Sequence, residues 1–139
     1  MQKPKSHKEF TDLEFEKLFS KADLDPELFT HEAHLRLAWI HISKYGLQQA
    51  EENVSNQIRA FVSKLGAEDK YNHTVTIAAI RAMNHFMLRT NRSDFSKFMI
   101  EHPRLLTHFK DLLLSHYKTN IFTSEKAKKE FIYPELIPF

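Results

Sequence analysis

The sequence predicts an all-α protein, a single-domain antiparallel helical bundle of about four main helices with short helices near both ends. Apolar residues recur at helical spacing along nearly the whole chain, and the segments between these patterns are short. Only 2 glycines occur in 139 residues, which is few for a sheet-rich or turn-rich protein. Apolar residues make up 42% of the chain and include 12 phenylalanines, which is enough for one core without cross-links.

The first helix is predicted at Asp12–Ala22. Thr11 is a suitable N-cap, and Glu14 completes a capping box three residues later. Residues 1–10 are expected to form a flexible N-terminal tail. Pro26 follows an aspartate and predicts a turn, or a single helical turn with proline at its first position.

The two glycines are expected to end the next two helices. One helix is predicted at His31–Lys44, with Thr30 as its N-cap and Gly46 in a left-handed conformation at its end. The next is predicted at Leu47–Leu65 and ends before Gly66. Its apolar residues follow the three- and four-residue spacing of a bundle interface: Leu47, Ala50, Val54, Ile58, Phe61 and Leu65.

The second half of the chain contains one long predicted helix and three shorter ones. These are His73–Arg89, Asp94–Glu101, Arg104–His116 and a last helix at 125–131 with Ser124 as its cap. Asn91-Arg92-Ser93 is expected to break the chain after the long helix. The tail at 132–139 is too apolar to extend into solvent, so we expect it to pack on the body or on a partner.

Charge and composition exclude several classes of function. The chain has 20 Lys+Arg against 18 Asp+Glu, a net charge of +2, which is too small an excess for a nucleic-acid or anionic-membrane binder. The count of cysteines is 0, which excludes disulfides and thiolate chemistry. The apolar runs are too short to span a membrane, and no apolar stretch follows the first ten residues. We therefore expect no signal peptide and a cytoplasmic location.

Several polar rings occupy the side of the 31–44 helix where core residues are expected. His31, His34 and His41 lie opposite the charged side of this helix. Because an unsatisfied buried polar group costs about 1–3 kcal/mol, these rings need partners. His31 and His34 lie three residues apart in the first turn, where the helix dipole favours neutral imidazoles. Neutral imidazoles can bind a metal, accept a proton or accept a hydrogen bond.

A second polar cluster leads into the 73–89 helix. In an antiparallel bundle this helix runs parallel to the 31–44 helix, so both helices begin at the same end. The sequence therefore predicts a polar, His-lined pocket at these two helix starts. The predicted ligand-binding residues are His31, His34, Lys70, Tyr71, Asn72, His73 and Thr74.

Three functions remain open for this cluster. The sequence does not identify a catalytic residue for any of them. The first is a binding protein for a small polar or anionic ligand held by the helix starts, the histidines and Lys70. The second is an enzyme that uses a divalent transition metal, with His31, His34 and His73 as the candidate ligands. The H-x-x-H spacing alone is a weak metal signal, and H-E-x-x-H is absent.

The third function is a structural or protein-interaction module, whose histidines form a satisfied network and whose apolar tail docks a partner. Whether the chain forms a homo-oligomer is open. The other histidines are expected to be structural or at the surface, with His41 on the buried face and His7 in the N-terminal tail.

Three stretches form recognisable motifs. Phe29–Trp39 contains F-x-H-x-x-H…A-W, and Lys70–Thr76 reads K-Y-[HN]-x-T-x-T. Ser124–Pro138 contains S-x-x-A-[RK]-x-x-F…P-[DE]-L-x-P. In these motifs, over residues 29–138, the chain resembles a family of small, uncharacterised bacterial all-α proteins.

The resemblance implies a shared pocket around His31, His34, Tyr71 and Thr74, and it implies no activity. This chain departs from the family pattern at Asn72, where the family has histidine. The histidine of this chain follows one residue later, and one residue turns a helical side chain by about 100°.

Overall fold

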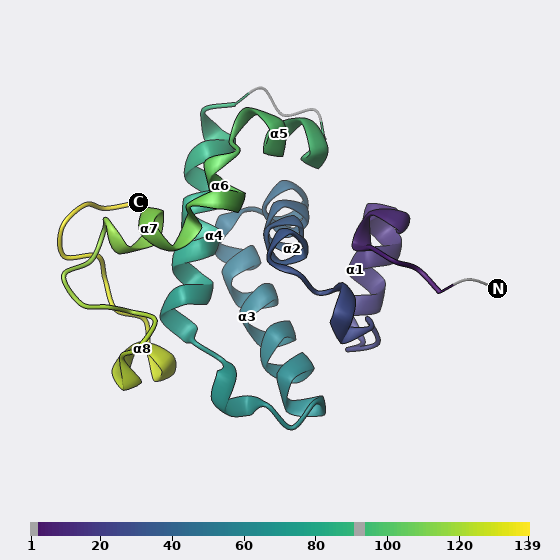
Figure 1. Cartoon of the computed structure of the whole chain (residues 1–139), viewed down its shortest axis with the longest axis horizontal. Helices are drawn as coiled ribbons and strands as arrows, with labels where there is room; N and C mark the ends of the chain where they lie inside the picture. Colours follow the sequence, from purple (N-terminus) through teal and green to yellow (C-terminus); the bar gives the residue numbers. More distant parts are fainter. Residues whose placement is uncertain (1–2, 91–93) are drawn as a thin grey trace.

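A computed structural model describes residues 3–90 and 94–139 (Figure 1). Across these residues it contains eight α-helices, three 3₁₀ helices and no strand, which confirms the all-α prediction. The predicted chain break at 91–93 lies outside the described residues. No helix of the described part combines the length and apolar character needed to cross a membrane.

Three long helices form the centre of the molecule: α2 (His31–Tyr45), α3 (Leu47–Lys64) and α4 (His73–Leu88). Each of the three packs against the other two. The chain reverses between α2 and α3 and again, through η3 (Glu68–Lys70), between α3 and α4 (Figure 1). As a result, α2 and α4 begin at the same end of the bundle, as predicted.

Both glycines adopt a positive φ at helix ends, as the sequence predicts. Gly66 has φ +69°, and the bonds from its N–H to Ser63 O and from Ala67 N–H to Val62 O form a Schellman motif. Gly46 has φ 86° and ψ 168°, which is not the left-handed helical conformation that was expected. This extended conformation, open mainly to glycine, lets one residue end α2 and begin α3.

Helix α1 (Asp12–Ser20) packs against α2 and α3. The predicted capping box is confirmed: the Thr11 hydroxyl accepts from Glu14 N–H, and the Glu14 carboxylate accepts from Thr11 N–H. The helix ends two residues earlier than predicted, because Ala22 adopts a φ of 55°. The turn at Pro26 is the short 3₁₀ helix η2 (Pro26–Leu28).

The N-terminal segment is fastened to α2 by Arg36. His7 belongs to the 3₁₀ helix η1 (His7–Glu9) and is only 3% exposed, so its expected place in a flexible tail is wrong. Arg36, one of the residues on the charged side of the predicted 31–44 helix, is also buried and donates to His7 O, Phe10 O and Asp12 Oδ1. The buried guanidinium thus finds its acceptors in the segment before α1.

The predicted helix at 104–116 is two short helices, α6 (Arg104–Thr107) and α7 (Phe109–Leu114). They are separated at His108, whose backbone has φ −134° and ψ 32°, outside the helical region. This break points Leu105 into the main core while α7 continues toward α4. Helix α5 (Phe95–Glu101) matches its prediction, and α8 (Glu125–Lys129) ends before Phe131.

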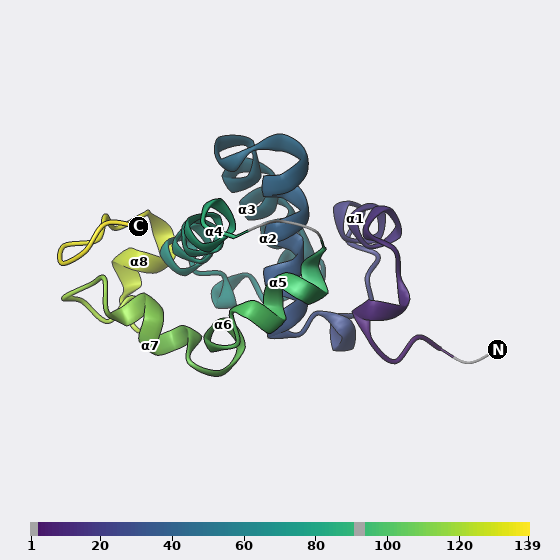
Figure 2. The same cartoon turned by 90° about the horizontal axis from the view of Figure 1, so that it is seen from above.

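The C-terminal tail lies along the body beyond α7, as Figures 1 and 2 show. The Tyr117 hydroxyl donates to Ile132 O at 2.8 Å, and Leu136 N–H donates to His116 O at 3.0 Å. The His116 ring stacks on Phe139 with centroids 4.1 Å apart. Ile132 and Phe139 pack on a small second core cluster formed by α4, α7, α8 and the segments between them.

Candidate functional site

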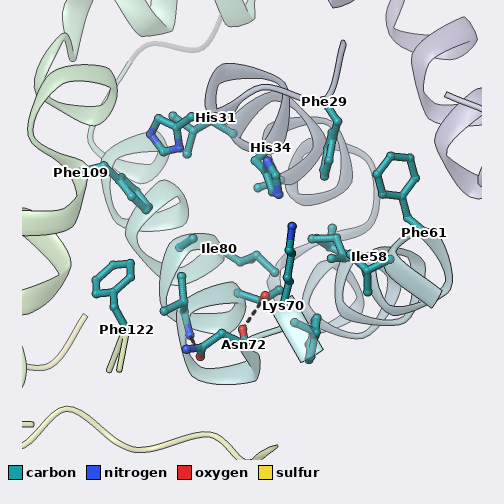
Figure 3. A pocket seen from close by; sticks show the side chains of 18 residues that line it. Phe29, His31, His34, Ile58, Phe61, Lys70, Asn72, Ile80, Phe109 and Phe122 are labelled. Atoms are coloured by element: carbon teal, nitrogen blue, oxygen red, sulfur yellow. Dashed lines mark hydrogen bonds between the residues drawn. The ribbon is translucent and has the colours of Figure 1, made fainter. Parts of the chain in front are cut away.

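A cavity of about 480 Å³ lies where the starts of α2 and α4 meet (Figure 3). Its wall includes His31 and His34 from the first turn of α2, and Lys70, Tyr71 and Asn72 from the segment that leads into α4. Five of the seven predicted ligand-binding residues are therefore brought together. Residues at the starts of α2 and α4 therefore lie beside one cavity.

Most of the wall is apolar, which corrects the predicted polar pocket. Helices α3 and α4 contribute aliphatic side chains that include Val54, Ile58 and Ile80. Aromatic rings complete much of the remainder: Phe29, Phe61, Tyr71, Phe109 and Phe122. The apolar faces that form the bundle core extend to this end, so polar groups occupy only a few points of the wall.

His31 is held by a backbone carbonyl of α6. Its Nε2 lies 2.9 Å from Leu105 O, and its ring packs against Phe109 with centroids 4.8 Å apart. Because a carbonyl oxygen only accepts, Nε2 carries the proton and Nδ1 is an acceptor in the neutral ring. His31 therefore joins α2 to the α6–α7 segment.

His34 is held by its own helix. Its Nδ1–H donates to Thr30 O at 3.1 Å, and its ring stacks on Phe29 with centroids 3.7 Å apart. The side chain is exposed where the cavity opens to the surface. Desolvation by the protein atoms packed around the ring, with a smaller effect from nearby His31, lowers the pKa of His34 to about 4. The prediction of a neutral imidazole is confirmed for His34, with desolvation as the principal cause.

Lys70 extends from the opposite side of the cavity toward His34 (Figure 3). In the part of the chain that the structure describes, it is the only lysine, arginine, aspartate or glutamate on the wall. The wall therefore presents one positive charge and no carboxylate. The Lys70 side chain is exposed, so an anion that enters the cavity can reach its ammonium group.

Tyr71 and Asn72 contribute to the wall but are already engaged. The Tyr71 hydroxyl lies 2.7 Å from His73 Nδ1, and the Arg59 guanidinium lies over its ring at 4.8 Å. Burial raises the pKa of Tyr71, so the phenol stays protonated near neutral pH. Asn72 caps α4 through Val75 N–H and donates its amide to Ile121 O at 2.8 Å.

His73 and Thr74, predicted as ligand-binding residues, do not line the cavity. Thr74 is fully buried; it donates to Glu130 O at 2.7 Å and accepts from Ile132 N–H at 3.0 Å. His73 bonds to Tyr71 and Arg59, and burial lowers its pKa. Since each step along a helix turns the side chain by about 100°, Asn72 faces the cavity and the next two residues turn away.

The three histidines predicted as metal ligands are not brought together. His31 and His34 share the cavity wall, whereas His73 lies outside it. Among residues 3–90 and 94–139, no group of three or more His, Asp or Glu side chains could hold a metal ion. The three-histidine site is therefore not assembled in this structure.

Phe109 and Phe122 are wall residues that the sequence analysis missed. Phe109 begins α7 and Phe122 lies in the turn before α8, both far in sequence from the other wall residues. A phenylalanine in a turn between helices is the only sequence signal for Phe122, and it does not indicate where the ring packs. His41, predicted on the buried face of its helix, is buried and does not line the cavity, and its Nδ1 lies 3.3 Å from Asn53 Nδ2.

No family model matches the chain, and neither a curated protein nor a solved structure does. The resemblance to the family of bacterial helical proteins therefore stays a prediction.

Proposed function

We propose that the protein binds a small, mainly apolar molecule in this cavity, and that an anionic group of the ligand lies near Lys70. One observation carries this proposal: a cavity of about 480 Å³ has an apolar and aromatic wall with a single cation. Ligand sites typically measure about 300–1,000 Å³ and combine apolar walls with a few polar groups. The aromatic rings favour a planar ligand, because such rings stack or meet edge to face.

Electrostatics select the charge of the ligand. The wall carries Lys70 and no carboxylate, and His34 is neutral near pH 7. An anion placed near Lys70 would compensate the ammonium group, whereas a cation would meet repulsion without any compensating carboxylate. The expected ligand class is therefore an apolar carboxylate or a similar amphipathic anion.

A second hollow, of about 490 Å³, is a weaker candidate. It lies around Arg36, His7 and Glu32, whose charged and polar groups already bond to one another or to backbone carbonyls. A ligand there would have to replace bonds that fasten the N-terminal segment. In the proposed site, by contrast, the ammonium group of Lys70 makes no hydrogen bond or ion pair with any residue that the structure describes.

The test is calorimetric titration with three naphthalenes of similar shape. We expect 2-naphthoate to bind, 2-naphthamide to bind about tenfold more weakly, and the naphthylmethylammonium cation not to bind measurably. Lys70→Met keeps the length of the side chain and should remove the preference for the anion. Lys17→Met removes an exposed lysine of α1 that does not line the cavity, and should leave all three affinities unchanged.

A blocking variant tests the location. Ala79 lines the cavity, and Ala79→Phe would place a ring inside it. We expect this variant to fold and to lose 2-naphthoate binding. Unchanged binding in Ala79→Phe, or no binding of any naphthalene to the wild-type protein, would contradict the proposal.

The cytoplasmic location and the formation of homo-oligomers stay predictions. The count of cysteines is 0, which is compatible with a reducing compartment. Light scattering over a range of concentrations measures the oligomeric state.

A further inference from the structure

The hydrogen bond that His34 makes with its own helix determines whether its other ring nitrogen can donate to a ligand or accept from one. Because Nδ1 bonds to the Thr30 carbonyl, the proton of the neutral ring is on Nδ1. Nε2 is then an acceptor. It has no hydrogen-bond partner among the residues that the structure describes, and it is the ring nitrogen farther from the helix backbone.

His34 and Lys70 point toward one another within the cavity, as Figure 3 shows. One presents an acceptor and the other a cationic donor, although no hydrogen bond joins them. A ligand head group placed between them therefore meets an acceptor on one side and a donor on the other. His34 is exposed, so water can donate to its Nε2 until a ligand covers the ring. A ligand head group that only accepts, such as a bare carboxylate, would satisfy Lys70 but would displace that water and leave Nε2 without a donor.

We propose that the ligand is an aromatic carboxylate with a hydroxyl or N–H donor beside the carboxylate, so that the carboxylate faces Lys70 and the donor bonds to Nε2 of His34. This inference rests on the proposed function and specifies its ligand class. The stack of His34 on Phe29 holds the ring plane, so the direction of the Nε2 lone pair is set before the ligand binds.

His31 is a less suitable partner for the same donor. Its Nε2 is bonded to Leu105 O, and its ring packs on Phe109 rather than pointing toward Lys70. His31 therefore supplies the matched control for a change at His34, because both are histidines of the same wall in the same turn of α2.

Two isosteric acids test the inference by calorimetric titration at pH 7.5. Indole-2-carboxylate and benzofuran-2-carboxylate share shape and charge, but one has a ring N–H beside the carboxylate where the other has a ring oxygen. We expect the indole to bind the wild-type protein at least about tenfold more tightly, since the benzofuran oxygen cannot donate to Nε2. In His34→Phe, which keeps a ring against Phe29, the difference should fall below about threefold. In His31→Phe the wild-type ratio should persist.

A second measurement uses only the wild-type protein, so it does not depend on whether the variants fold. In protein labelled with ¹⁵N at histidine, indole-2-carboxylate should shift the His34 Nε2 resonance upfield, as a new hydrogen bond to an unprotonated nitrogen does. Benzofuran-2-carboxylate should not produce this shift.

Equal affinities of the two acids, or a ratio that His31→Phe abolishes and His34→Phe retains, would overturn the donor requirement and leave the proposed function intact. If neither these acids nor 2-naphthoate binds, the proposed function itself fails.

Discussion

The charge of His34 is decided by what surrounds its ring. Its place in the first turn of α2 suggested a neutral imidazole, and in the structure desolvation by the protein atoms around the ring is the main cause of its lowered pKa. In the N-terminal segment, burial also lowers the pKa of His7, but there the bond from its Nε2 to Glu32 Oε1 at 2.9 Å partly opposes the lowering. Position along the sequence does not distinguish these environments.

We predict that His34 titrates at about pH 4 in the folded protein, as NMR of the imidazole nitrogens would measure. The unfolded state takes up this proton near pH 6.5 and the folded state does not, so the free energy of unfolding falls as pH decreases from 6.5 toward 4. Below that range His34 contributes no further loss. His34→Gln should reduce the decrease, while His108→Gln, an exposed control, should not; a His34 midpoint at or above 6.5 would contradict the prediction.

Thr74 is a structural residue at a place where the sequence predicts ligand contact. Its hydroxyl satisfies Glu130 O and Ile132 N–H, so it joins the start of α4 to the chain after α8. Thr76, two residues later, donates to Asn72 O, which already accepts a backbone N–H of its own helix.

Thr74→Val should therefore lower the free energy of unfolding by about 1–3 kcal/mol, because two partly buried backbone groups lose their partner. Thr76→Val should cost less than about 1 kcal/mol, since the Asn72 carbonyl stays bonded. Urea unfolding of both variants measures the difference, and equal losses would contradict the structural role assigned to Thr74.

At the scale of the helix, α1 and α3 end in the same hydrogen-bonded motif, but a different residue type occupies its positive-φ position. After α3, Gly66 has a positive φ and the Schellman hydrogen bonds. After α1, the bonds from Ala22 N–H to Phe19 O and from Asp23 N–H to Leu18 O have the same pattern. The residue with positive φ is here Ala22, at φ 55°, which carries a Cβ that this conformation disfavours.

We predict opposite effects of exchanging these two residue types. Ala22→Gly should raise the free energy of unfolding by up to about 1 kcal/mol, and Gly66→Ala should lower it by about 1 kcal/mol. A Cβ at Gly66 would meet nothing within 4 Å, so its cost is conformational rather than steric contact with neighbours. Thermal and urea unfolding measure both changes, and a destabilised Ala22→Gly would refute the explanation.

The helices that the sequence predicts best are those with clear end signals. Thr11, Thr30 and Gly66 mark ends that the structure confirms. The predicted helix at 104–116 was wrong because its apolar spacing continues through His108, while the backbone leaves the helical region there. In the structure Leu105 O accepts from His31, a tertiary contact that the local pattern does not contain.

At the scale of the whole molecule, the C-terminal tail closes the second core cluster. Tyr117 is buried, and its hydroxyl has Ile132 O as its acceptor. The tail also leaves apolar side chains exposed, among them Tyr133, Leu136 and Ile137. One side of the tail therefore packs on the second core cluster, while its other side is exposed to solvent.

Deletion of residues 132–139 should lower the free energy of unfolding by about 2 kcal/mol or more, because the Tyr117 hydroxyl loses its acceptor and apolar area becomes exposed. Ile137→Ser, a change at an exposed side chain of the same tail, should alter stability by less than about 0.5 kcal/mol. Urea unfolding measures both, with light scattering to follow association. A truncated protein as stable as the full chain would show that the tail contacts contribute little.

The sequence by itself determined the helical class and most helix ends, because periodicity, caps and glycines act locally. The order of the helices further predicted that α2 and α4 begin at the same end. Only the tertiary structure decided which side chains face the cavity. Asn72 faces it and Thr74 does not, although they are two residues apart, and Phe109 and Phe122 complete the wall from distant segments. The physical reason is that packing between elements assembles a cavity wall. Because each step along a helix rotates the side chain by about 100°, neighbouring residues can face the cavity or be buried against another element.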